Sequence, residues 1–166
     1  MIAGKPDDRA GRGGARRGAP AGDGPDDELQ RPRTRSGARQ RALEILYAAD
    51  LLEQPIATVL ARELNDQHRP PPDAYTVELV TGVERRRTEL DARVEAAAER
   101  WTLERMPLVD RNLLRLGVFE LLERREVPTA VILDEAIELA KLLSTEDSSR
   151  FVNGVLGRIA RDARGG

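Results

Sequence analysis

The 166-residue sequence has no cysteine, a single histidine and only 3% aromatic residues. The lack of cysteine excludes disulfide-stapled folds, thiolate zinc sites and thiol nucleophiles, and one histidine is too few for most histidine-based acid–base machinery. The scarcity of aromatics argues against a multi-aromatic platform for stacking nucleobases. Its apolar runs are too short to span a bilayer, and the N-terminus lacks the apolar stretch of a signal peptide. The sequence therefore predicts a cytoplasmic protein with no membrane contact.

Catalytic and cofactor motifs are also missing. His68 lies in a proline-rich stretch with no partner for a metal or nucleophile set. Asp134 and Glu138 stand one helical turn apart, but a di-metal bundle would also need a Glu-x-x-His pair, which the chain lacks. The glycines near Gly11 follow no strand and open no helix, so they form no phosphate loop. We expect no enzyme, no cofactor and no bound metal.

The composition changes sharply near residue 34. Residues 1–34 contain seven Gly and four Pro, and their seven Lys/Arg nearly balance six Asp/Glu. Such a segment cannot bury enough apolar surface to offset chain entropy, so we interpret 1–34 as a disordered leader and 35–166 as one folded domain. With a net charge of −2, the chain has no global basic field, and any affinity for nucleic acid must come from a local cluster.

Beyond the leader the apolar residues recur at helical spacing, and no two-residue alternation indicates a strand. The pattern predicts an all-α fold, a compact bundle of six to seven helices. Asp73 is expected to cap a long helix that bends near Gly82 and buries Trp101. Later helices are expected from about Pro107 to Arg125, after Pro128, and from Ser144 or Thr145 onward. Gly154 is expected to permit a close helix contact.

Arginines gather where the leader meets the first helix. Within eleven residues stand Arg31, Arg33, Arg35, Arg39 and Arg41, and no acid interrupts residues 29–43. Guanidinium groups form forked hydrogen bonds with phosphates and stack on bases. This cluster is the best candidate for an RNA-binding arm, and a solvated helix start is the alternative.

Three blocks of sequence resemble one family. They are VILDEAIELAK at 131–141 with EDSSRFVNGVL at 146–156, VDRNLLRLGVFEL at 109–121, and RQRALEILY at 39–47. Together they are similar to the NusB family of bacterial transcription antitermination factors, over roughly residues 35–160. The leader lies outside the resemblance, apart from its last arginines.

The resemblance implies a fold of two packed helical bundles and a concrete function. NusB proteins bind the boxA element of nascent RNA together with NusE, which is also a small-subunit ribosomal protein. The complex helps RNA polymerase to read through terminators in ribosomal RNA operons. By this resemblance the RNA-binding residues would be Arg33, Arg35, Arg39 and Arg41. The residues at the edge shared by NusE and the RNA would be Tyr47, Asp110 and Asp147.

Two other interpretations stay open at this point. The helical domain also resembles one fused to some RNA cytosine methyltransferases, which would require a further cofactor-binding domain. An all-helical adaptor that binds only proteins would not need the arginine cluster, and salt-dependent binding to boxA-like RNA would distinguish it. The sequence does not decide between a monomer and a homodimer.

Overall fold

The computed structural model describes residues 34–165, and within this range every regular element is a helix. The all-α prediction is confirmed. The elements, in chain order, are α1 Arg35–Leu52, α2 Ile56–Leu64, α3 Ala74–Arg85, α4 Arg87–Ala98, the short 3-10 helix η2 Leu103–Arg105, α5 Leu108–Glu123, α6 Thr129–Leu143 and α7 Glu146–Arg164. None of the helices in this range has the length and apolar character needed to cross a membrane.

Local sequence signals set where the helices begin. The side chain of Asp73 accepts a hydrogen bond from the amide of Thr76 and caps α3, as the sequence predicts. Thr34 caps α1 by accepting from the amide of Gly37, and Thr145 caps α7 by accepting from that of Ser148. These oxygens satisfy amides that a helix N-terminus leaves without partners.

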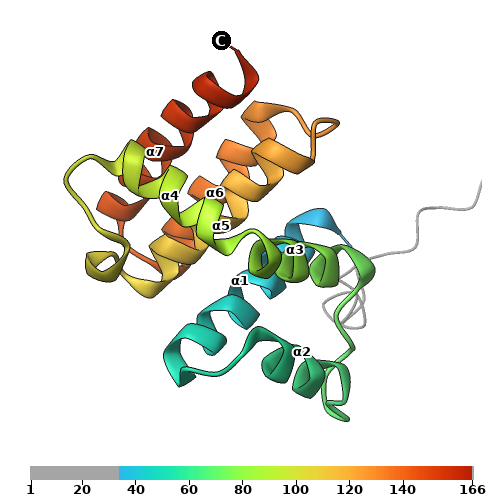
Figure 1. Ribbon diagram of the computed structural model, residues 1–166. Coiled ribbons are helices and arrows are strands. Elements are labelled where there is room, and N and C mark those ends of the chain that lie inside the picture. Colours follow the sequence, from blue (N-terminus) through green and yellow to red (C-terminus); the bar gives the residue numbers. More distant parts are fainter. Residues whose placement is uncertain (1–33, 166) are drawn as a thin grey trace, which may run out of the picture.

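The helices form two bundles that share α5 (Figure 1). Helices α1, α2 and α3 pack together on one side, and α4, α6 and α7 pack on the other. Helix α5 contacts members of both groups and is buried along nearly its whole length, from Asp110 to Leu121. The two groups therefore join through α5. The first turn of α1 lies near the loop between α5 and α6, where Arg35 approaches Glu126.

The long helix expected from Asp73 to Trp101 is instead two helices. It breaks at Arg86, four residues beyond the predicted bend at Gly82. Helix α4 then ends at Ala98. The next residue, Glu99, has a positive φ of 53°, and Trp101 lies beyond the helix and is 51% exposed. The expectation that Trp101 belongs to the core is wrong, because the apolar spacing continues past the point where the helix ends.

Close helix contact occurs at Gly82 and Gly117 rather than at Gly154. A methyl group at Gly82 would overlap the ring of Phe119 at 2.2 Å, and one at Gly117 would meet Leu156 at 2.8 Å. No atom lies within 4 Å of the corresponding position at Gly154, which is exposed. The expectation for Gly154 is wrong because this residue lies on the outer face of α7.

These glycines give a matched pair of substitutions. Gly82→Ala should lower the free energy of unfolding by about 1–3 kcal/mol, because the Phe119 ring has to move out of a packed core. Gly154→Ala adds the same methyl group to open space in a helix and should raise stability by up to about 1 kcal/mol. Urea unfolding of both variants checks the difference, and equal effects would contradict the packing at Gly82.

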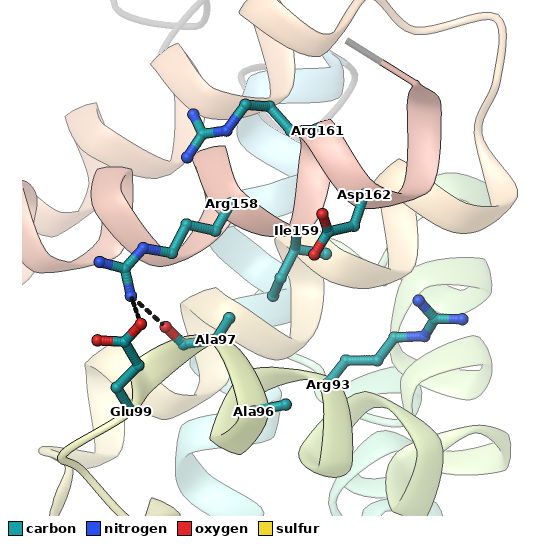
Figure 2. A pocket seen from close by; sticks show the side chains of 8 residues that line it. All are labelled: Arg93, Ala96, Ala97, Glu99, Arg158, Ile159, Arg161 and Asp162. Carbon is teal, nitrogen blue, oxygen red and sulfur yellow. Dashed lines mark hydrogen bonds and ion pairs between the residues drawn. The ribbon is translucent and has the colours of Figure 1, made fainter.

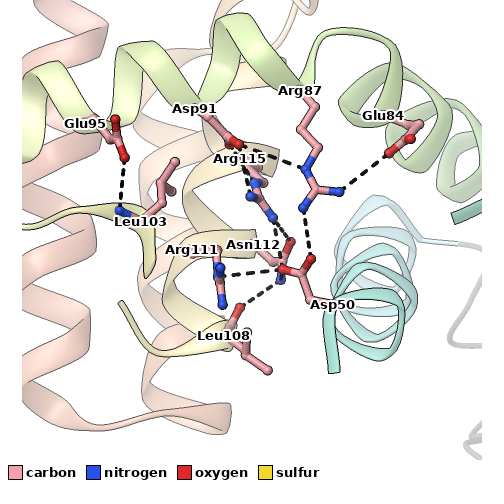
Figure 3. Close-up of polar contacts among 10 residues, drawn as sticks. All are labelled: Asp50, Glu84, Arg87, Asp91, Glu95, Leu103, Leu108, Arg111, Asn112 and Arg115. Carbon is pink, nitrogen blue, oxygen red and sulfur yellow. Dashed lines mark hydrogen bonds and ion pairs between the residues drawn. The ribbon is translucent and has the colours of Figure 1, made fainter. Parts of the chain in front are cut away.

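A polar network ties α1 to α4 and α5 where the two bundles meet (Figure 3). The carboxylate of Asp50 on α1 accepts hydrogen bonds from Asn112 and Arg115, each at 3.0 Å, and from Arg87 at 3.1 Å. The guanidinium of Arg115 also binds Asp91 on α4 through two bonds, of 2.7 and 3.1 Å. Arg115 thus joins three helices through two carboxylates, and it is 4% exposed.

Candidate RNA-binding and partner-binding surfaces

Among the described arginines of the cluster, the exposed one is Arg35, in the first turn of α1. The Arg35 side chain is 54% exposed, and its guanidinium lies 4.9 Å from the centroid of the Tyr75 ring. It also lies 3.9 Å from the carboxylate of Glu126, which is equally exposed. An exposed ion pair at this distance is weak, so Arg35 keeps most of its capacity to bind a phosphate. Arg33 lies outside the described residues.

Arg39 is part of the core. It is 5% exposed and donates to both carboxylate oxygens of Glu120, from Nε at 2.7 Å and from Nη2 at 2.8 Å. Tyr75 donates its hydroxyl to the same carboxylate at 2.9 Å. Burial alone would lower the pKa of Arg39, but the bonds and charge of Glu120 raise it above its ordinary value. An RNA-binding arm and a solvated helix start would both expose Arg39, and the structure contradicts that exposure.

The Tyr75 hydroxyl is affected by the same buried carboxylate, that of Glu120. Desolvation and the neighbouring charge of Glu120 raise the pKa of the Tyr75 hydroxyl to about 12. The hydroxyl therefore stays protonated and keeps donating to Glu120 across the physiological range. Three guanidinium groups, those of Arg35, Arg39 and Arg124, lie within 6 Å of this ring, between 4.9 and 5.9 Å from its centroid.

Arg41 is also buried, with 3% exposure. Its guanidinium donates to the carbonyl of Pro70 at 2.5 Å and to the carboxylate of Glu63 at 3.1 Å. It thereby fastens α1 to the end of α2 and to the proline-rich segment before α3. The expected exposure of Arg41 is wrong for the same physical reason as at Arg39: each guanidinium is used by carboxylate or carbonyl oxygens of this chain.

The three residues assigned to the partner edge differ in exposure. Tyr47 is half-buried on α1, whereas Asp147 is exposed in the first turn of α7. Asp110 is 2% exposed and accepts hydrogen bonds from the hydroxyls of Ser144 at 2.9 Å and Ser148 at 2.8 Å. Asp110 therefore joins the start of α5 to the start of α7 and offers little carboxylate surface to a partner.

Asp110 and Asp147 both line one hollow, which has a volume of about 250 Å³. Its other walls are Trp101, Met106, Pro107, Thr145, Ser148 and Phe151. Trp101 and Phe151 make an edge-to-face contact with ring centroids 6.4 Å apart. Aromatic side chains, tryptophan above all, are enriched at protein-binding surfaces. Sequence reasoning missed Trp101, and the structure adds it to the candidate partner surface.

A second hollow, of about 400 Å³, lies between α4 and α7 (Figure 2). Arg158 pairs with Glu99 at 3.1 Å and donates to the carbonyl of Ala97 at 2.9 Å, and Arg93 pairs with Glu89 at 3.3 Å. Asp162 adds a further carboxylate to the rim. The arginines here are largely balanced by acids, so this hollow has no clear preference for phosphate. Within residues 34–165 no group of three or more His, Cys, Asp or Glu residues is placed to hold a metal ion.

The sequence and the fold both match known proteins. The sequence profile of the NusB family matches residues 36–161. The transcription antitermination protein NusB of Saccharopolyspora erythraea is 54% identical over 127 residues, which cover 76% of this chain and 86% of the relative. That of Salinispora arenicola is 48% identical over 131 residues, covering 78% of this chain and 96% of the relative.

Solved structures agree with the fold. A crystal structure of the antitermination factors NusB and NusE in complex with double-stranded RNA matches with a TM-score of 0.68 and 30% identity, over 77% of this chain and 96% of the other. A structure of NusB from T. maritima matches with a TM-score of 0.69 and 32% identity, over 78% and 92% of the two chains.

The fold and these relatives place the chain in a class of all-helical transcription factors. The relatives are antitermination proteins and not enzymes. The chain belongs to the NusB family. The expectations of this family and of a non-enzymatic protein are confirmed.

Proposed function

We propose that this protein binds boxA-type RNA jointly with NusE and helps RNA polymerase in the cytoplasm to read through terminators in ribosomal RNA operons. The observation that carries the proposal is the exposed arginine at the start of α1, on a chain whose solved relatives include a NusB–NusE–RNA complex. In this proposal Arg33 and Arg35 contact RNA phosphates. Arg39 and Arg41 support RNA binding indirectly, because their buried contacts hold α1 in place.

The geometry at Tyr75 favours RNA over a protein-only adaptor. The aromatic ring, with Arg35 above it, stands in a region where three guanidinium groups meet. Two of them are committed in part to carboxylates: Arg39 to Glu120, and Arg124 to Glu78. The exposed Arg35 is the member free to turn toward a phosphate, and stacking on Tyr75 restricts its side chain beforehand.

Arg35→Ala should weaken binding to a boxA RNA oligonucleotide several-fold with little effect on the melting temperature. The loss of one phosphate contact should also flatten the slope of log affinity against log salt by roughly 0.7. Fluorescence anisotropy over a salt series, with and without NusE, measures both quantities. Arg62→Ala, on the exposed face of α2, is the control. If affinity and slope are unchanged in Arg35→Ala, the start of α1 is not the RNA arm.

For the protein partner, we propose that NusE contacts Tyr47 on α1 and the hollow that Trp101 and Asp147 line. Asp147 is suited to a basic partner because it is exposed, and Thr145 rather than Asp147 caps α7. The carboxylate is therefore not needed to satisfy the backbone of its own helix.

Asp147→Asn should lower NusE affinity several-fold while changing the free energy of unfolding by less than about 1 kcal/mol. Titration with NusE beside a thermal melt of each variant separates the two effects. Glu146→Gln, on the adjacent and equally exposed residue, is the matched control. Equal NusE affinities of wild type and Asp147→Asn would remove Asp147 from the partner surface.

A further inference from the structure

A groove of about 760 Å³ lies between the first turn of α1 and the outer face of α6. Its walls on the α1 side are Thr34, Ser36, Gly37 and Gln40, and those on the α6 side are Val131, Asp134, Glu135, Glu138, Leu139 and Leu142. None of the described residues assigned above to RNA or to NusE lines this groove, so its function needs a separate explanation.

The groove is acidic. Of the ten described residues that line it, three are carboxylates and none is a cation. Glu135 accepts a hydrogen bond from the Ser36 hydroxyl at 2.6 Å, and the buried Arg39 lies 3.9 Å away from it. Asp134 and Glu138 are exposed. The Glu138 carboxylate lies 3.7 Å from the Lys141 ammonium, an exposed and therefore weak ion pair. The groove therefore suits a ligand that carries positive charge.

The groove also has an apolar side. Val131 is 40% exposed and Leu142 is 65% exposed, whereas Leu139 below them is buried. Two exposed aliphatic side chains beside three carboxylates fit a short basic segment that contains one aliphatic residue.

This chain contains such a segment directly next to the groove. Thr34, one wall of the groove, is preceded by Leu29-Gln30-Arg31-Pro32-Arg33, which has two arginines and no acid. Leu29 is the only Val, Leu, Ile, Met or Phe between residues 3 and 42. Five residues reach at most about 17 Å, and such a short tether gives an effective concentration on the order of millimolar.

We propose that residues 29–33 bind this groove within the same chain. Arg31 and Arg33 pair with Asp134 and Glu138, and Leu29 packs against Val131 and Leu142. Binding in the groove withdraws Arg33 from solvent, so RNA competes with the groove for this arginine. The competition rests on the proposed function, whereas the binding of the segment does not.

Disulfide trapping in the full-length chain tests the proposal, because the sequence has no native cysteine. The pair Gln30→Cys and Gln40→Cys places one thiol on the segment and one on the groove wall without removing a proposed contact. We expect intramolecular oxidation at low salt to slow several-fold when Asp134→Asn and Glu138→Gln are added. The control pair, Glu104→Gln and Asp162→Asn, neutralises two exposed carboxylates outside the groove and should leave the rate unchanged.

Equal oxidation rates in the groove and control variants overturn the proposal. A disulfide that forms mainly between chains also overturns it and assigns the groove to a second copy. Addition of boxA RNA should slow the oxidation in the parent pair, and an unchanged rate overturns the competition. The RNA affinity of the same proteins is measured separately by anisotropy, so failure of the groove contact is distinguishable from failure of RNA binding.

Discussion

Arg39→Ala is expected to lower the free energy of unfolding by about 3–5 kcal/mol, the range for breaking a buried ion pair by removing one partner. Glu120 is 2% exposed, and after the substitution the Tyr75 hydroxyl is the one side-chain donor left to its carboxylate within residues 34–165. A buried carboxylate without its cation is costly because the interior solvates charge poorly. Chemical denaturation of wild type and variant measures the loss.

Two matched variants separate charge from packing at this position. Arg35→Ala removes the same side chain one turn away, where it is 54% exposed, and should cost less than about 1 kcal/mol. Arg39→Met combined with Glu120→Leu replaces both members of the pair by apolar groups and should recover much of the stability lost in Arg39→Ala. A stable Arg39→Ala protein with weakened RNA binding would show instead that this guanidinium serves RNA.

The arginine cluster shows where prediction from sequence stops. The pattern correctly locates the start of α1, but it cannot tell which arginines face solvent. Glu120, the partner of Arg39, is 81 residues away, and Pro70 and Glu63, the partners of Arg41, are 29 and 22 residues away. Local spacing gives information on neighbours within one or two turns of a helix, so it contains none on these hydrogen bonds and ion pairs.

The helices themselves were more predictable, because their limits depend on nearby residues. Asp73 caps α3 as expected, and Pro55 and Pro128 stand at the starts of α2 and α6. The predictions that failed concern features that depend on contacts between helices. Gly154 has the same local pattern as a contact glycine, but Gly82 is the one that meets a ring, that of Phe119 on α5.

The second large effect is expected at the junction of the two bundles. Arg115→Ala should lower the free energy of unfolding by about 3–5 kcal/mol at neutral pH. The side chain of Arg115 is 5% exposed and binds Asp50 at 3.0 Å and Asp91 at 2.7 Å. Its removal takes from Asp50 and Asp91 the buried guanidinium that joins them where α1, α4 and α5 meet, and leaves the more exposed Arg87 as the cation near both (Figure 3).

The pH dependence follows from Asp50. Burial by itself would raise the pKa of this carboxyl, but the hydrogen bond from Asn112 and the charges of Arg115, Arg87 and Arg111 lower it below its ordinary value. A carboxyl with a lowered pKa in the folded state stabilises the fold above its unfolded pKa, near 4, and this contribution is lost as the pH falls through the folded value.

The cost of Arg115→Ala should therefore be largest near pH 7 and should shrink below about pH 4, as the two carboxylates that pair with Arg115 become protonated. Urea unfolding at a series of pH values measures the difference between wild type and variant. Lys141→Ala removes a cation that is 56% exposed and should show almost no cost at any pH. A constant difference between pH 3 and pH 7 would mean that Arg115 stabilises the junction by packing of its alkyl chain, and that its charge contributes little.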